Sequence, residues 1–105
     1  MFGYSNGGRF AATIGVDRPD VFGNVFAFSL AVGTPAEFSE TPKVSSRFFF
    51  CAGRWEESFL KRSADFHKSL LDAGVKSQMV ERVSGHDTIM WQEEFAHAVQ
   101  QAFAK

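Results

Sequence analysis

Apolar and polar positions alternate along the chain with two different periods, which predict strands and helices in turn. Near-continuous apolar runs, typical of strands covered on both faces, occupy residues 24–30 (NVFAFSL) and 47–52 (RFFFCA), and a third strand is expected over 76–83. Helical spacing of apolar residues predicts helices over about 6–17, 57–73 and 88–104. This order favours parallel βαβ units, so we expect an α/β fold with a short parallel sheet of about three strands and flanking helices.

Each expected helix has a side suited to cover the sheet. In the first, Ala11 and Gly15 are small enough for close contact with strands, and Phe10 and Ile14 lie one turn apart beside them. In the second, apolar residues gather near one side: Phe59, Ala64, Phe66, Leu70 and Leu71. Gly74 follows as a natural helix-ending residue. The last helix presents a similar set: Trp91, Phe95, Ala98, Val99, Ala102 and Phe103.

Composition adds the size and class of the protein. With 105 residues, 45% of them hydrophobic and 22% charged, the chain is expected to form a single globular domain over residues 1–105, which excludes disordered and fibrous classes. The net charge is −1 and the Lys and Arg residues are scattered, which argues against nucleic acid or an anionic membrane surface as partner. The apolar runs are too short to cross a bilayer.

Two features of the apolar residues affect later expectations. The single cysteine, Cys51, lies in RFFFCAG and is expected to be a buried small hydrophobe; no intrachain disulfide can form. The 13 Phe residues give a small chain a large apolar area to bury, so we expect part of it to need surface from elsewhere.

Residues 34–46 are polar and contain two prolines, which predicts a loop that shapes part of a pocket.

The first residues hold a pattern typical of a tight strand-to-helix turn. Gly3 and Gly7 flank Ser5 at two residues on either side, which gives the backbone room and turns the hydroxyl outward. The following helix would aim the N–H of Asn6 at a developing oxyanion. A glycine-rich loop or a helix cap can contain the same residue pattern. The pattern therefore needs support from the rest of the chain before it indicates a nucleophile.

A histidine follows the last expected strand, where a loop can hold an imidazole over the carboxyl ends of a parallel sheet. This residue, His86 in VSGHDTIMW, is the best candidate for a general base. Its neighbour Asp87 is poorly placed to approach the ring and is expected to favour the start of the last helix through the helix dipole. His67 and His97 fall within helices, where ordinary surface or partly packed histidines are expected.

Two carboxylates follow the strand over residues 47–52. Glu56 and Glu57 stand in AGRWEESF, and either could orient an imidazole or serve only the start of the next helix; Glu56 is favoured for the functional role. The chain order Ser, Glu, His is that of one class of serine hydrolases.

With these motifs in place, essentially the whole chain resembles the C-terminal half of serine esterases of the α/β-hydrolase fold, in the enterochelin esterase and esterase D group. The resemblance is carried by GYSNGGRFA, RPDVFGNVFAFS, AGRWEESF, FHKSLLDAGV and SGHDTIMWQEEFAHAV, in that order. It implies a partial α/β-hydrolase fold that begins at the nucleophile turn. It also implies Ser5 as nucleophile, His86 as base and Glu56 as acid, because relatives often have Gly-x-x-Glu where Gly53 to Glu56 stand.

The same resemblance implies roles around this triad. Asn6 would supply one oxyanion N–H, and Tyr4 and Trp55 would line the acyl site, although large aromatic side chains beside a site often serve packing alone. Strands before the turn and the loop that donates the second oxyanion N–H have no counterpart here, so we expect a part of a hydrolase about twice this length or more.

The expected function is carboxylic-ester hydrolysis on a small-molecule substrate, with no cofactor and no metal. An acyltransferase or thioesterase could use the same residues. A catalytically inactive remnant that associates through its exposed sheet edge is the alternative from another class. The sequence names neither the ester nor the compartment; the cytoplasm is favoured, although a leader on a longer parent chain would not be visible here.

Overall fold

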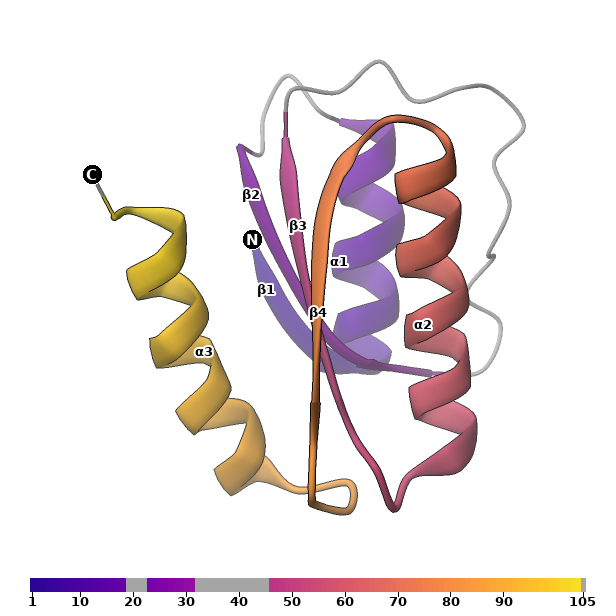
Figure 1. The fold of residues 1–105 in the computed structure, drawn as a ribbon, viewed down its shortest axis with the longest axis vertical. Coiled ribbons are helices and arrows are strands. Elements are labelled where there is room, and N and C mark those ends of the chain that lie inside the picture. Colours follow the sequence, from indigo (N-terminus) through magenta and orange to yellow (C-terminus); the bar gives the residue numbers. More distant parts are fainter. Residues whose placement is uncertain (19–22, 32–45, 105) are drawn as a thin grey trace.

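The sheet is parallel throughout and is covered by helices on both faces. The computed structural model describes residues 1–18, 23–31 and 46–104. Its elements are β1 (Phe2–Ser5), α1 (Asn6–Asp17), β2 (Asn24–Leu30), β3 (Arg47–Gly53), α2 (Glu57–Asp72), β4 (Lys76–Arg82) and α3 (Thr88–Ala102). The strands pair in the order β1-β2-β3-β4, with α1 and α2 on one face and α3 on the other (Figure 1). The predicted α/β fold with a parallel sheet is confirmed.

One strand exceeds the expectation of about three. β1 is not among the strands expected from the sequence, but it pairs with β2, Phe2 opposite Phe26 and Tyr4 opposite Phe28. The chain start is held as well, since the Phe26 N–H donates to the Met1 carbonyl over 2.7 Å. Gly and Ser weaken the strand signal in FGYS, so the backbone groups of β2 decide this pairing rather than local propensity.

The core lies in two layers separated by the sheet. Toward α1 and α2, the buried side chains include Val25, Phe48, Phe50, Phe66 and Leu70. Toward α3, the cluster includes Phe26, Phe28, Phe49, Cys51 and Trp91. Alternate residues of β2 and β3 point to opposite faces, and both faces are covered, which explains the near-continuous apolar runs of these strands.

The first helix approaches the sheet through its small residues. Gly8, Ala11, Ala12 and Gly15 are its buried positions. A Cβ atom on Gly15 would lie 2.7 Å from Val25 Cγ2, too close for any side chain. The expected close contact at Ala11 and Gly15 is therefore confirmed, whereas Phe10 lies on another side of α1 and is 60% exposed.

Two side chains expected on buried helix faces are exposed. Leu71 lies beside the buried line of α2, and Phe103 follows the last residue of α3; they are 49% and 68% exposed. Gly74 has φ +80°, as expected of a helix-ending glycine. Of the loop expected over residues 34–46, residues 34–45 lie outside the described parts of the chain.

Candidate functional site

The three residues expected to carry chemistry lie beyond the carboxyl ends of parallel strands. Ser5 ends β1, Glu56 follows β3, and His86 follows β4. Figure 1 shows the connections after β3 and β4 at the same end of the sheet as the starts of α1 and α2. Because all four strands run in one direction, the fold places Ser5, Glu56 and His86 at the same carboxyl end of the sheet.

The turn at Ser5 is strained. Ser5 has φ 57° and ψ −119°, a conformation that costs a side-chain-bearing residue about 1–3 kcal/mol. The pairing register with β2 also shifts between Tyr4 and Ser5. Strain of this kind is typical of a serine held on a sharp turn between strand and helix.

Two glycines make the turn sterically feasible, and they are not the symmetric pair expected from the sequence. A Cβ on Gly3 would lie 2.1 Å from the Gly7 carbonyl oxygen, and a Cβ on Gly8 would lie 2.4 Å from the Phe28 carbonyl oxygen. Gly7 faces open space. The close approaches therefore require Gly3 and Gly8, and the expectation that Gly7 provides room is wrong.

Asn6 is the first residue of α1, directly after the strained serine. The first N–H groups of a helix have no partner within it and carry its partial positive charge. The Ser5 side chain makes no capping hydrogen bond to this helix. The N–H of Asn6 is thus suited to stabilise negative charge next to Ser5.

A buried carboxylate holds the imidazole of His86. Glu56 is 6% exposed, and its Oε1 lies 2.6 Å from His86 Nδ1. Its other oxygen, Oε2, accepts hydrogen bonds from the Gly53 N–H over 2.5 Å and from Ser29 Oγ over 2.6 Å. Glu57 is exposed in the first turn of α2. Of the two carboxylates, the structure brings Glu56 to His86.

Aromatic side chains surround the histidine ring. It stacks on Phe59 with ring centres 4.1 Å apart and meets the edge of Trp91 at 4.6 Å. Tyr4 stacks on the same indole of Trp91 at 4.3 Å. Trp91 therefore connects the strand end that carries Ser5 with the loop that carries His86.

Ser5 and His86 are not joined directly. Within the described ranges, no hydrogen bond links the Ser5 hydroxyl to the His86 ring. Because Glu56 occupies Nδ1, the Nε2 of His86 is left for another partner, and its side chain is 34% exposed. Catalytic hydrogen bonds are often long in unliganded sites and shorten when substrate binds.

Among the described residues, the remaining candidates form no hydrogen bond or ring contact with Ser5, Glu56 or the His86 ring. Asp87 caps α3, its carboxylate accepting from the Ile89 N–H over 2.7 Å, as expected. Trp55 is 70% exposed. His67 contacts Ser77 Oγ at 2.5 Å, and burial lowers its pKa. His97 lies on α3 beside Glu94, 3.4 Å away.

Sequence reasoning missed two residues of the site. Ser29 is fully buried, has φ 49°, and lies between Glu56 and Trp91. Trp91 was expected only as part of a buried helix face. The one available signal was a polar residue near the end of the apolar run NVFAFSL.

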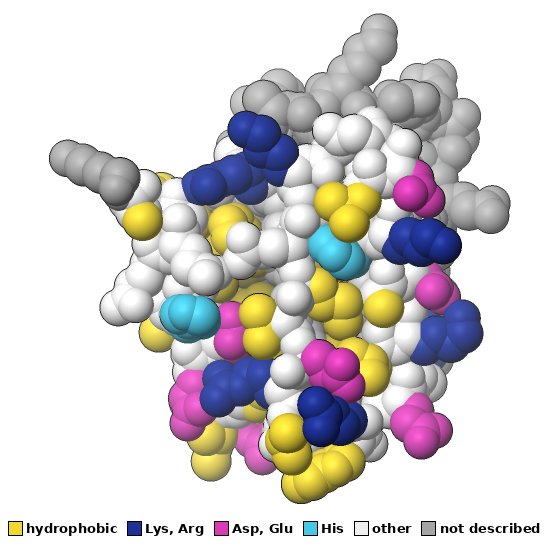
Figure 2. All heavy atoms as spheres, viewed as in Figure 1, with side chains coloured by type: hydrophobic (Ala, Val, Ile, Leu, Met, Phe, Trp, Pro, Cys, Tyr) yellow, Lys and Arg dark blue, Asp and Glu magenta, His cyan; other side chains and the backbone are white. Residues whose placement is uncertain are grey.

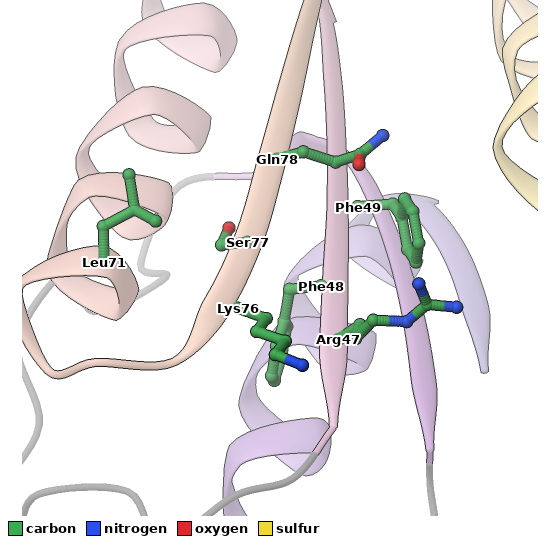
Figure 3. A pocket seen from close by; sticks show the side chains of 7 residues that line it. All are labelled: Arg47, Phe48, Phe49, Leu71, Lys76, Ser77 and Gln78. Carbon is green, nitrogen blue, oxygen red and sulfur yellow. The ribbon is translucent and has the colours of Figure 1, made fainter. Parts of the chain in front are cut away.

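A hollow of about 320 Å³ lies at the other end of the sheet. Arg47 and Lys76, the first residues of β3 and β4, line it (Figure 3). Its position at the amino ends of the strands separates it from Glu56 and His86. Figure 2 shows charges of both signs spread over the viewed face.

The described residues lack two other kinds of site. No cluster of three or more His, Cys, Asp or Glu side chains suited to a metal ion was found among them. No helix within the same residues combines the length and hydropathy needed to cross a bilayer.

The fold is similar to those of known proteins with solved structures. The chain matches the solved structure of a ferulic acid esterase with TM-score 0.72 and 21% identity, over 91% of this chain and 48% of that one. It also matches a protein of unknown function from Agrobacterium tumefaciens with TM-score 0.68 and 17% identity, over 98% and 50%. No family model and no curated protein matches.

These matches define what the fold is similar to. The chain spans about half the length of both solved structures. At these identities the likeness is one of fold alone. The chain thus has an α/β fold with a four-stranded parallel sheet that corresponds to half of an esterase structure.

Proposed function

We propose that the protein is part of a serine esterase. The observation that carries the proposal is the 2.6 Å contact between Glu56 Oε1 and His86 Nδ1, at the same carboxyl end of the sheet as the strained Ser5. A carboxylate that fixes Nδ1 leaves Nε2 free to act as a base toward a serine hydroxyl. The likeness to a ferulic acid esterase supports an ester as substrate.

The reaction would proceed through an acyl-enzyme. Ser5 Oγ attacks the ester carbonyl carbon while His86 Nε2 accepts the hydroxyl proton. The tetrahedral intermediate collapses, and His86 returns the proton to the departing alcohol. Water then attacks the acyl group, giving its proton to His86, and the carboxylic acid leaves as Ser5 regains a proton. Glu56 keeps the imidazole oriented throughout.

Further residues would support this chemistry. The N–H of Asn6 would stabilise the oxyanion, and Tyr4, 42% exposed and stacked on Trp91, would form part of the acyl site. Trp55 would contact the outer part of a larger substrate. An oxyanion donor of this kind typically contributes about 100-fold or more to turnover.

Covalent labelling of Ser5 tests the proposal more directly than turnover. A fluorophosphonate probe reports the activated hydroxyl even where hydrolysis is slow. We expect labelling of the native chain, its loss in Ser5→Ala and strong reduction in His86→Ala. Ser58→Ala, a change of an exposed serine on α2, serves as the matched control. No labelling of a demonstrably folded chain would overturn the assignment.

A thioesterase or acyltransferase would use the same residues with a different leaving group or acceptor. Assays with an ester and a thioester of the same acid separate esterase from thioesterase activity. Adding an alcohol separates transfer from hydrolysis, because transfer to the alcohol gives a new ester as product.

A second candidate function is that of an inactive interaction module. It is favoured by one observation: β1 is an edge strand of the described sheet, and Phe2 and Tyr4 on it are 37% and 42% exposed. Edge strands and apolar surface promote association. A folded chain that associates but is not labelled would support this candidate over the esterase.

A further inference from the structure

Ser29 has a combination of properties that the proposed reaction does not explain. It is the penultimate residue of β2, is fully buried, and has φ 49°. A positive φ is unfavourable for a residue with a Cβ atom, and a buried hydroxyl needs hydrogen-bond partners. The positive φ costs free energy, and the buried hydroxyl avoids a second cost only through its hydrogen bonds.

Its two hydrogen bonds have a defined direction. Trp91 Nε1 lies 2.8 Å from Ser29 Oγ, and Ser29 Oγ lies 2.6 Å from Glu56 Oε2. An indole N–H can only donate, so Ser29 Oγ must accept from Trp91. The single hydroxyl proton of Ser29 is therefore directed to Glu56.

This arrangement fixes the Glu56 carboxylate on one side. Oε2 is held by two donors, the Ser29 hydroxyl and the Gly53 N–H, which come from different strands. Oε1 is left for His86 Nδ1. Rotation of the carboxylate away from His86 would break both hydrogen bonds to Oε2 in a buried environment, where unpaired polar groups are costly.

We propose that Ser29 is a positioning residue that, with Trp91, locks Glu56 against His86. Its effect on catalysis rests on the proposed esterase function; its effect on the Glu56–His86 contact does not. Trp91 strengthens the same arrangement from α3, because its ring also touches His86 and Tyr4. Docking of α3 and alignment of the histidine are thereby coupled.

The test is an NMR measurement of the His86 Nδ1–H proton, whose downfield signal reports a short hydrogen bond to a carboxylate. Its assignment comes from loss of the signal in His86→Gln. We expect the signal in the native chain and its loss or broadening in both Ser29→Ala and Ser29→Gly. Glycine relieves the positive φ and alanine does not, so a shared loss reflects the missing hydroxyl rather than the backbone.

Ser63→Ala is the matched control. Ser63 is also a fully buried serine, and its Oγ accepts from the N–H of Leu30, the residue after Ser29. Its removal disturbs the same end of β2 without touching Glu56, so the His86 signal should remain. Persistence of the signal in both folded Ser29 variants, or its equal loss in Ser63→Ala, would overturn the proposal.

A second readout concerns Ser5. Fluorophosphonate labelling should be about 10- to 100-fold slower in both Ser29 variants and within about 3-fold of native in Ser63→Ala. Labelling at the native rate in variants that have lost the signal would overturn the catalytic part. A native chain that is never labelled overturns the esterase proposal instead, and the NMR comparison still decides the role of Ser29.

Discussion

At the scale of single residues, the candidate site depends on a few groups held by close backbone contacts and hydrogen bonds. Ser5 occupies a strained backbone conformation, and the glycines beside it allow the backbone to pass at distances that exclude a Cβ. Glu56 is held by three hydrogen-bonding partners in the protein. The chemistry proposed for Ser5 and His86 therefore depends on neighbours that would not touch a substrate.

The two adjacent carboxylates should differ sharply when each is changed to its amide. In Glu56→Gln, an amide cannot accept from both Gly53 and Ser29 and also hold His86 Nδ1–H as a carboxylate does. We expect Ser5 labelling to slow by about 100-fold or more. Glu57→Gln, at an exposed position, should label at nearly the native rate. Slow labelling in Glu57→Gln alone would identify Glu57 as the acid.

The glycines at the turn should also differ. Gly3→Ala would place a Cβ 2.1 Å from the Gly7 carbonyl oxygen, so we expect a loss of about 1–3 kcal/mol or more in the free energy of unfolding. Gly7→Ala meets open space within α1 and should be neutral or stabilising by up to about 1 kcal/mol. Urea denaturation measures both, and equal losses would contradict this account of the turn.

At the scale of elements, β3 links the core to the site. Its residues are buried from both sides, and the turn after it presents Glu56. Cys51 lies within β3 and has no exposed area, as the apolar run predicted. Burial, followed by the negative charge of Glu94, raises the pKa of its thiol to about 12.

Cys51 should consequently be unreactive in the folded chain. Thiolate is the reactive form, so at pH 8 we expect almost no reaction with a disulfide reagent until the protein unfolds. The unfolded thiol ionises near 9 and the folded one near 12, so stability should fall as pH rises through this range. Rapid reaction of the Cys51 thiol in the folded chain would contradict its burial. Cys51→Ala lacks this thiol, so its free energy of unfolding should fall less at alkaline pH.

At the scale of the whole molecule, the described sheet has two layers of core but an uncovered margin at β1. Phe2 and Tyr4 on β1 are partly exposed, and Phe10 on α1 is 60% exposed. A row of unpaired backbone groups beside apolar side chains favours association. The large number of Phe residues predicted a need for additional surface, and Phe2 and Tyr4 on this edge strand are two of the exposed aromatic residues.

Self-association should therefore respond to charge placed at this margin. We expect sedimentation velocity to detect association of the native chain at micromolar concentration and its reduction in Phe2→Lys, which places a charge on β1. Phe103→Lys, which changes an exposed phenylalanine beyond the end of α3, is the control. Equal effects of the two substitutions would show that association does not use the β1 margin.

The elements themselves were largely predictable. Helix and strand periods located α1, β2 and the following elements to within a few residues, because long apolar patterns report which faces are buried. β1 was missed as a full strand, since four residues that include Gly3 and Ser5 show no such pattern. Leu71 and Phe103 were assigned to buried faces by spacing alone, but Leu71 lies beside the buried residues of α2 and Phe103 lies beyond the end of α3, so both are exposed.

The sequence by itself determined the α/β class, the order of the candidate residues and their place after successive strands, because these follow from local periodicity and chain order. Only the tertiary structure showed that Glu56, and not Glu57, contacts His86, and only it revealed Ser29 and Trp91 next to Glu56. Those contacts join residues far apart in the chain, and their geometry depends on how strands and α3 pack. Local sequence patterns carry no record of such distances.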